Sequence, residues 1–422
     1  MSKKIGFWFE NSGISSIDVS QPLLGNAGVG GTEYQFALLA DLLLSVKGED
    51  LKITFFVETP QKLNSSIEQV IVQNLNEAYG KASQLNIDFL IFRPRRDISN
   101  EVKAIIYKKT KLIPWLHITP KREFLDWFVN NSLIHRVIFV GDDQRMRVID
   151  HEVYGISSTI YNSSNGFFEI STQRRRNSVV YLGALVPRKG FHILAKSWPD
   201  VRKKIPDAEL YVIGSGALYD RDSQLGPMHL AEISYENEFV ASLGGEIGIE
   251  KNAVHFLGNL GFSKHKFISS ATVGVVNPSG LTENCPMSVV EFYQAGIPVV
   301  SSTKYGMRDM VISGETGFLC KTSKELTSVL IKFLEGSLNS ENLGLNGFAF
   351  AKNKFSPNRI IEEWMRIFEG SFPQVHDIHG YWIHKSFRAL KKMRLLSTRF
   401  PMVEDQKIYL ASLRNESLKM RR

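Results

Sequence analysis

Short runs of apolar, β-branched and aromatic residues alternate with longer polar stretches along the first half of the chain. Runs of about four to eight such residues are typical of buried strands. They occupy residues 5–9, 51–57, 87–92, 111–117 and 136–140. Between the first two runs, residues 34–46 have the length and leucine content of a helix, with Thr32 as a candidate N-cap. Strands that alternate with helices predict a parallel sheet with right-handed crossovers.

The same alternation restarts in the second half of the chain. An amphipathic helix is predicted at residues 191–205, and further apolar runs occupy residues 179–184, 208–213, 254–257 and 271–276. Between the halves, residues 160–166 are rich in Asn, Ser and Gly, a composition typical of domain boundaries. We therefore predict two parallel-sheet α/β domains, at residues 1–170 and 171–370, and a tail at residues 371–422.

The composition fits a soluble two-domain protein. A chain of 422 residues is too long for one typical core, and 43% hydrophobic with 22% charged residues is ordinary for a globular protein. No apolar run approaches the roughly 20 residues that span a bilayer, and Glu10 interrupts the first run before it reaches signal-peptide length. Two cysteines, Cys285 and Cys320, are too few for a disulfide framework. We therefore expect a cytoplasmic protein.

The basic character of the chain belongs to its tail. Residues 371–422 hold eleven Lys or Arg and four Asp or Glu, which accounts for +7 of the net charge of +8. The two domains therefore give no charge-based reason to expect a nucleic-acid partner. Within the tail, residues 381–396 place apolar side chains on one helical face and Lys or Arg largely off it. Such a helix can lie on an anionic membrane or dock on the body of the protein, and both remain open.

The stretch at residues 278–300 carries the candidate chemistry. Pro286 stands where proline is tolerated best, in the first turn of a helix, so the helix should begin near residues 284–286. Glu283 then precedes the helix and Glu291 lies about two turns inside it. The free N–H groups at a helix N-terminus favour anions. Carboxylates beside such amides suit a sugar diphosphate, which offers hydroxyls to the acids and phosphate oxygens to the amides.

In its context this stretch resembles the Glu, seven residues, Glu signature of the family-4 retaining glycosyltransferases, which have the GT-B fold. Pro278-Ser279 precedes the signature and Gly296-Ile297-Pro298 follows it. Spacing alone proves little, because Glu238 and Glu246 have the same separation. The residues by themselves also fit an ordinary strand-loop-helix-strand unit with two exposed glutamates.

Other loops extend the resemblance to roughly residues 5–370. The segment Gly28-Val29-Gly30-Gly31-Thr32-Glu33 looks like the family's first βα loop, and Lys189-Gly190 matches its Lys-Gly. The family normally has an arginine five residues before that lysine, where this chain has Ala184. Arg188 is a candidate substitute, and Arg188 with Lys189 also fits a solvated charge pair.

The resemblance implies roles for particular residues. Glu283 would contact the sugar, Glu291 would hold the ribose hydroxyls, and Lys189 would offset charge on the leaving diphosphate. His117, at the end of a predicted strand, would face the sugar and the acceptor, although a lone histidine is as often structural. The implied catalytic residues are Glu283, Lys189 and His117, and the implied donor-binding residues are Gly30, Gly31, Arg188, Lys189, Asn284, Cys285, Pro286, Met287 and Glu291.

The sequence also contains two weaker patterns. Gly214-Ser215-Gly216 resembles a dinucleotide fingerprint, but Tyr219 stands where the third glycine belongs. Asp220-Arg221-Asp222 matches a metal-binding pattern of another glycosyltransferase fold, and we interpret it as a solvated turn. Neither pattern predicts a cofactor or a metal.

The resemblance therefore implies a retaining, metal-independent glycosyltransferase of GT-B fold. It would move a sugar from a UDP- or GDP-type donor to a hydroxyl of a saccharide or lipid-linked glycan, in cell-surface polysaccharide synthesis. It would work in the cytoplasm, and the tail, if it lies on the membrane, would make it peripheral at the inner face. Two alternatives remain open: a sugar-nucleotide epimerase of the same fold, and a non-catalytic sugar-nucleotide-binding or scaffold protein.

Overall fold

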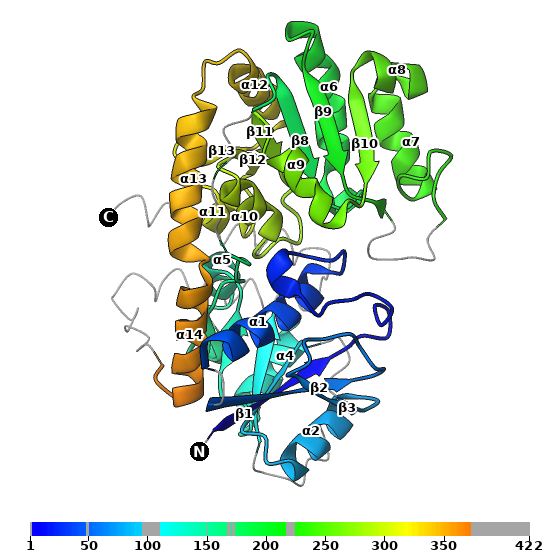
Figure 1. Ribbon diagram of the computed structural model, residues 1–422. Helices are drawn as coiled ribbons and strands as arrows, with labels where there is room; N and C mark the ends of the chain where they lie inside the picture. The colour runs from blue at the N-terminus through cyan, green and yellow to red at the C-terminus, as the bar shows by residue number, and fades with distance from the viewer. Residues whose placement is uncertain are drawn as a thin grey trace.

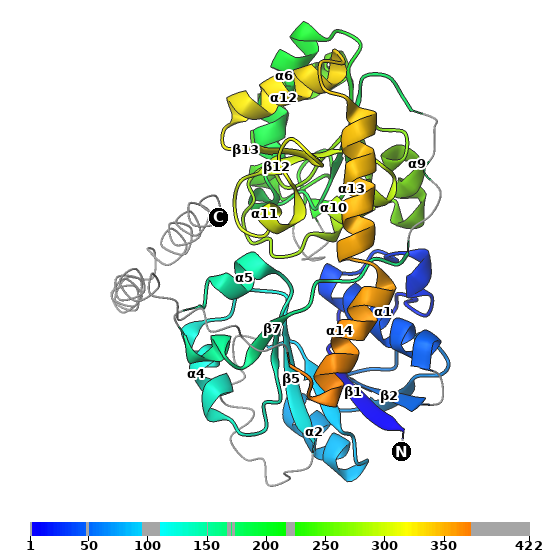
Figure 2. The ribbon, with the colours of Figure 1, turned by 90° about the vertical axis from the view of Figure 1, so that its left-hand side faces the viewer.

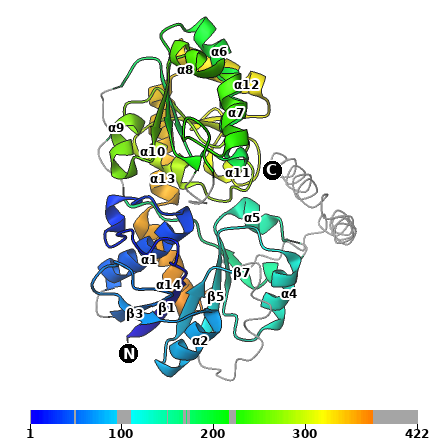
Figure 3. The same ribbon diagram turned by 90° about the vertical axis from the view of Figure 1, so that its right-hand side faces the viewer.

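The computed structural model describes residues 2–47, 50–94, 110–149, 151–166, 170, 174–216 and 224–372, which form two lobes (Figure 1). Each lobe is built around a parallel sheet with helices on its faces (Figures 1 and 3). We call the two lobes the first and second domain. The predicted tail helix at residues 381–396 and the Asp220-Arg221-Asp222 segment lie outside the described residues. Among the residues described, none of the helices is long and apolar enough to cross a membrane.

The sheet of the first domain is parallel throughout, in the order β3-β2-β1-β4-β5-β6-β7. Its central strands are buried on both faces, which explains why they appear as continuous apolar runs. In chain order the strands are β1 (Lys3–Phe9), β2 (Leu51–Val57), β3 (Glu68–Ile71), β4 (Phe89–Phe92), β5 (Lys111–Leu116), β6 (Val137–Phe139) and β7 (Ser157–Thr159). The five predicted strands are confirmed, whereas β3 and β7 were not predicted.

Helix α1 (Gly31–Lys47) packs its apolar side chains on the first sheet, and the ring of Phe36 stacks on Trp115 with 5.0 Å between centroids. The Tyr34 N–H donates to the Gly30 carbonyl, so the helix begins at Gly31. Thr32 therefore lies inside the first turn, and its prediction as the N-cap is wrong. The other helices of this domain are η1 (Pro22–Leu24), α2 (Leu75–Gln84), α4 (Arg122–Asn130), α5 (Asp142–Met146) and η3 (Glu152–Tyr154).

The second sheet is also parallel, in the order β10-β9-β8-β11-β12-β13. Its strands are β8 (Ser178–Leu182), β9 (Glu209–Ile213), β10 (Val254–Gly258), β11 (Val273–Val275), β12 (Val299–Ser302) and β13 (Gly317–Cys320). Its helices are η4 (Pro187–Lys189), α6 (Phe191–Lys204), α7 (Ile233–Ser242), α8 (Gly245–Lys251), η6 (Gly261–Lys264), α9 (His265–Ile268), α10 (Met287–Gln294), α11 (Met307–Met310), α12 (Ser323–Leu334) and α13 (Ser340–Lys354).

The chain returns to the first domain through its last described helix. Helix α13 runs along the second sheet, and α14 (Pro357–Glu369) continues down the first (Figure 2). The Trp364 ring meets Trp115 edge-on at 5.1 Å, and Phe368 lies 5.4 Å from Phe89. The sequence boundary at residue 370 counted this helix with the second domain, but its buried face packs on the first.

The two sheets meet through the loops at the carboxyl ends of their strands. After β1, the glycine loop approaches β10: a Cβ placed on Gly28 would lie 3.2 Å from the Asn259 amide nitrogen. After β5, the His117 carbonyl accepts a hydrogen bond from Asn284, which follows β11. Because ligands of open parallel sheets bind beyond the carboxyl ends of the strands, this junction is where a shared site is expected.

Candidate functional site

Helix α10 sets the candidate site at the junction. It begins at Met287, directly after Pro286, whose extended backbone occupies the N-cap position. Glu283 lies in the preceding loop and Glu291 lies inside the helix, as the sequence predicted. The first N–H groups of α10 have no partner within the helix itself, so the positive end of the helix is available beside Glu283.

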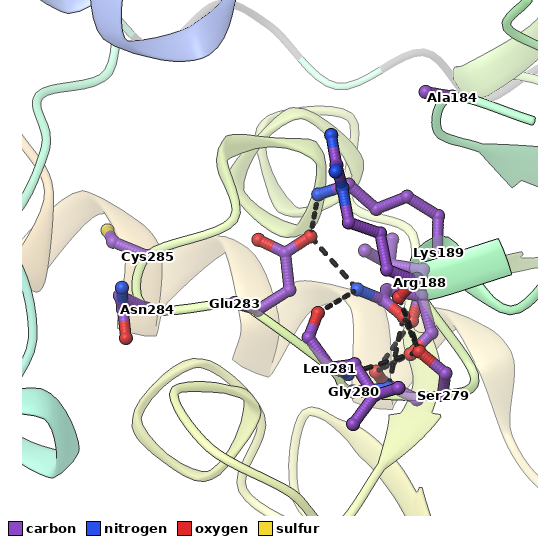
Figure 4. Close-up of polar contacts among 12 residues, drawn as sticks. Ala184, Arg188, Lys189, Ser279, Gly280, Leu281, Glu283, Asn284 and Cys285 are labelled. Atoms are coloured by element: carbon purple, nitrogen blue, oxygen red, sulfur yellow. Dashed lines mark hydrogen bonds and ion pairs between the residues drawn. The ribbon is translucent and has the colours of Figure 1, made fainter. Parts of the chain in front are cut away.

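Glu283 and Lys189, which are 94 residues apart in sequence, form an ion pair (Figure 4). The carboxylate also accepts a hydrogen bond of 3.0 Å from the Asn277 amide, so both contacts are made by the same oxygen, Oε1. Only 8% of Glu283 is exposed. A nearly buried carboxylate needs such partners, because an isolated charge is costly away from water.

The loop that carries Lys189 is fixed to the loop ahead of α10. The Ser279 hydroxyl lies 2.5 Å from the Arg188 carbonyl and 2.7 Å from the Asn277 side-chain oxygen. Gly190 has φ of +72°, and a Cβ on it would lie 2.4 Å from the Ser279 nitrogen. Only glycine fits this approach. The Lys-Gly pair is therefore a geometric unit in which Gly190 allows the close contact that places Lys189 beside Glu283.

The resemblance expected an arginine at the position of Ala184, and Arg188 is the candidate substitute for it. Ala184 is buried, with 3% of its surface exposed. In Figure 4 the Arg188 and Lys189 side chains both extend to the side of η4 where Glu283 lies, while Ala184 stands apart. A second cation is thus present on this loop, four residues later in sequence than the family pattern expects.

Glu291 faces a pocket between the domains. Its carboxylate forms an ion pair of 2.7 Å with Lys264, and burial together with the Glu291 charge raises the pKa of the Tyr34 hydroxyl. The pocket is lined by residues of both domains: Leu24, Gly25, Asn26, Tyr34, Ser164, Asn165, Phe262, Lys264, His265, Ile268, Met287, Glu291 and Gln294. The first turn of α1 and the middle of α10 therefore line the same pocket.

Gly30, just before α1, and Gly31, the first residue of α1, differ in their surroundings. A Cβ on Gly30 would lie 2.2 Å from an oxygen of Glu33, so a side chain here would displace the Glu33 carboxylate. A Cβ on Gly31 would meet no described atom within 4 Å. The space in front of Gly31 is therefore open, and this glycine begins α1, where backbone N–H groups face outward.

The two ring nitrogens of His117 are buried, and the ring is uncharged near neutral pH. Burial, and next the nearby Arg93 cation, lower the pKa of its imidazole to about 3. The ring lies against Trp115, with 4.5 Å between centroids, and neither ring nitrogen has a hydrogen-bond partner among the described residues. The side chain can therefore act as a neutral hydrogen-bonding group, and it has no charge near neutral pH.

The residues between Glu283 and α10 differ in what they can offer a ligand. Both polar atoms of the Asn284 side chain are directed at the first domain. Burial raises the pKa of the Cys285 thiol to about 12, so it is not a nucleophile at neutral pH. Pro286 has no N–H group. In this stretch, the hydrogen-bond donors that remain for a ligand are the backbone N–H groups of Asn284, Cys285 and Met287.

The sequence prediction missed a charged cluster at the carboxyl ends of the first sheet. Arg93, just after β4, contacts Glu33 at 2.7 Å and Glu10, just after β1, at 3.2 Å. Both Arg93 and Glu10 directly follow predicted strands, and that position was the available signal. This cluster lies beside His117, since the Arg93 charge lowers its pKa.

Solved structures of known proteins share this architecture. The structure of Anabaena Alr3699/HepE in complex with UDP-glucose superposes with a TM-score of 0.64 at 18% identity, covering 87% of this chain and 99% of that one. A mutant of S. aureus TarM in complex with Fondaparinux, α-GlcNAc-glycerol and UDP gives a TM-score of 0.57 at 16% identity, covering 70% and 59%. The protein has the GT-B fold, as predicted.

Sequence comparisons point to one family. Residues 176–336, which lie within the second domain, match the family model described as Glycosyl transferases group 1. The match is to group 1 as a whole, and the narrower family-4 resemblance is compatible with it.

Curated relatives are partial matches. An uncharacterized glycosyltransferase of Haemophilus influenzae is 27% identical over 45% of this chain and 48% of its own length. The capsular polysaccharide biosynthesis glycosyltransferase CapM of Staphylococcus aureus is 24% identical over 56% and 58%. The chain thus spans about half the length of these curated relatives.

Proposed function

We propose that this protein is a glycosyltransferase that moves a sugar from a nucleotide-diphosphate sugar to an acceptor hydroxyl. The observation that carries the proposal is the Glu283–Lys189 pair ahead of α10, in a domain that matches the group 1 glycosyltransferases. One oxygen of Glu283 is occupied by Lys189 and Asn277, which leaves the other for a sugar hydroxyl.

The diphosphate of the donor would lie at the start of α10. The backbone amides of Asn284, Cys285 and Met287, the open face of Gly31 and the Lys189 ammonium group would surround it. Arg188 would supply the second positive charge. Stabilising the charge that develops on a departing diphosphate is the main task in this class of reaction. These groups would do so without a metal, and the retaining outcome is proposed from the family-4 resemblance.

The nucleoside would occupy the pocket beside Glu291. This requires the carboxylate to exchange its ion pair with Lys264 for the ribose hydroxyls. Solved structures of similar fold hold UDP-glucose or UDP, and one relative in Mycolicibacterium smegmatis is a GDP-mannose-dependent mannosyltransferase. A donor of UDP or GDP type is therefore proposed, with no separate cofactor.

The acceptor would lie against the first domain. The neutral His117 and the cluster of Arg93, Glu10 and Glu33 would face its hydroxyls. Because the relatives include a capsular polysaccharide enzyme, we place a saccharide or lipid-linked glycan here.

The proposal is tested by incubating the protein with UDP- and GDP-sugars, with and without glycan acceptors, and measuring released UDP or GDP. Release should occur, and Glu283→Gln should reduce it at least about tenfold, because the uncharged amide no longer pairs with Lys189. Glu246→Gln is the matched control, since Glu246 is an exposed glutamate of the same spacing pattern. Interconversion of the donor sugar without release would favour the epimerase alternative. Binding without either reaction would favour a sugar-nucleotide-binding protein.

A further inference from the structure

We call residues 276–286, between β11 and α10, the donor loop. The Asn284 side chain joins this loop to the first domain. Its oxygen accepts a 2.5 Å hydrogen bond from Arg147, and its nitrogen donates a 3.0 Å bond to the His117 carbonyl. Asn284 directly follows Glu283, and only 4% of its surface is exposed. Both hydrogen-bonding ends of this side chain therefore contact the other domain, next to the residue that would hold the sugar.

Arg147 stands at the centre of these contacts. It follows α5, and 6% of it is exposed. Its Nε donates to the Asp143 carbonyl at 3.3 Å and lies 3.1 Å from the Asp143 carboxylate, and another nitrogen donates to the Thr119 hydroxyl at 2.9 Å. Its guanidinium carbon lies 5.0 Å from the centre of the Tyr305 ring of the second domain. A planar guanidinium has donors in fixed directions, so satisfying these partners together fixes their relative positions.

The backbone of the same loop is clamped from both sides. A Cβ on Gly141, in the first domain, would lie 2.8 Å from the Asn284 carbonyl oxygen, and one on Gly306, in the second, would lie 2.0 Å from it. The Gly306 N–H also donates to the Glu283 carbonyl. Beside this contact, α5 lies beneath α11 (Figures 2 and 3), and the Asp143 N–H donates to Asp309 at 2.7 Å. The donor loop is thus held where the two domains meet.

We propose that Arg147 is a positioning residue for the transfer reaction: through Asn284 it sets the place of the Glu283 loop relative to the end of β5. This inference rests on the proposed function. Arg147 lies in the acceptor-side domain and contacts Thr119 and Asn284 with adjacent nitrogens, so the donor loop and the acceptor-side strand are aligned only when the domains are closed. Misplacement of reacting groups by about 1 Å can cost about a hundredfold in rate.

The matched control is Arg145, two residues earlier, in the last turn of α5. Its guanidinium bonds to Ser157 and the Tyr154 carbonyl and lies 4.2 Å from the centre of the Tyr154 ring, so the contacts described for it stay within the first domain. Arg147→Met and Arg145→Met remove the same donors at neighbouring positions. A merely structural role would affect both variants alike, whereas a positioning role affects only the first.

Turnover is measured as UDP or GDP release from the donor that the wild-type protein uses, and the Kd for UDP or GDP is measured by calorimetry. We expect Arg147→Met and Asn284→Leu each to reduce kcat about ten- to a hundredfold, with the Kd changed less than about threefold. The variant that carries both substitutions should lose no more kcat than either single variant, because both substitutions remove the same Arg147–Asn284 interaction. Asn284→Asp, which keeps the acceptor oxygen, should retain most of the rate. Additive losses, or an equal loss in Arg145→Met, would overturn the proposal.

A second measurement does not depend on activity. Spin labels at two exposed positions, Glu68 in the first domain and Glu246 in the second, report the separation of the domains. The wild-type protein with UDP or GDP bound should give one short distance, and Arg147→Met and Asn284→Leu should each add a longer one. Unchanged distances in both would refute the positioning role, even if no donor were turned over. A wild-type protein without transfer activity but with these shifts would refute the proposed function alone.

Discussion

At the scale of single residues, the candidate site consists of charges that already have partners. Glu283 pairs with Lys189, Glu291 with Lys264, and Arg93 with two glutamates. Each pair holds its side chains in place before a ligand arrives, so less side-chain freedom is lost on binding. A donor would exchange these partners for its own oxygens.

Glu291 provides a direct measure of that exchange. Glu291→Ala should weaken donor binding about ten- to a hundredfold, because a charge-assisted hydrogen bond contributes about 1.5–3 kcal/mol. The Kd for the nucleotide is measured by calorimetry, with Glu246→Ala, at an exposed position, as the control. An unchanged Kd would remove Glu291 from the nucleoside site.

His117 makes stability depend on acidity. Its imidazole has a pKa of about 3 in the folded protein, below the ordinary value of 6.5, because the ring is buried and next because Arg93 is near. Between these values the unfolded chain binds a proton that the folded chain does not, so the free energy of unfolding falls as the pH drops below 6.5. The slope is up to about 1.4 kcal/mol per pH unit.

Replacing the imidazole tests this origin. His117→Phe should remove that slope, so that between pH 6.5 and 5 the wild-type protein loses about 2 kcal/mol more than the variant. Urea unfolding at several pH values gives both curves, and His255→Gln, at a half-exposed position, is the control. Parallel curves for wild type and His117→Phe would show that another group is responsible.

At the scale of elements, close contacts between loops place the charged side chains of the candidate site. Gly190→Ala should displace the Lys189 loop, because its new Cβ would lie 2.4 Å from the Ser279 nitrogen. Gly245→Ala is the control: this glycine also has positive φ, +77°, but no described atom lies within 4 Å of the added Cβ. Both substitutions should cost about 1 kcal/mol from the backbone conformation, and Gly190→Ala about 1–3 kcal/mol more. Urea denaturation measures the difference, and equal losses would contradict the contact.

The sequence predicted the buried strands and the loop motifs, since both depend on short segments. Strand β3 was missed because it is mostly exposed and polar, and β7 because Ser157, Ser158 and Thr159 are polar although largely buried. That Lys189 and Glu283 belong to one site followed from the family motif, but their ion pair did not. The Lys264 partner of Glu291 and the direction of Asn284 did not, since these depend on how distant segments pack, and Arg147 is 137 residues from Asn284.

At the scale of the whole molecule, α14 fastens the end of the second domain to the first. Trp364 is fully buried beside Trp115 and Phe368. Trp364→Ala should lower the free energy of unfolding by about 3–5 kcal/mol, as expected for removing a large buried ring. Leu345→Ala, at a half-exposed position of α13, should change it by less than about 0.5 kcal/mol. Chemical denaturation measures both, and a loss below about 1 kcal/mol for Trp364→Ala would contradict this packing.

The return of α14 has a consequence for engineering. In sequence, the second sheet lies between the strands of the first sheet and α14, which packs on that first sheet. The second domain is therefore an insert with two connections, near residues 174–177 and 355–356. Its family match, residues 176–336, falls inside those limits. A chimaera that exchanges the segment between both connections for that of a relative should therefore carry over the relative's choice of nucleotide while keeping this protein's own acceptor, provided that Asn284 and its partner arginine are transferred as a matched pair.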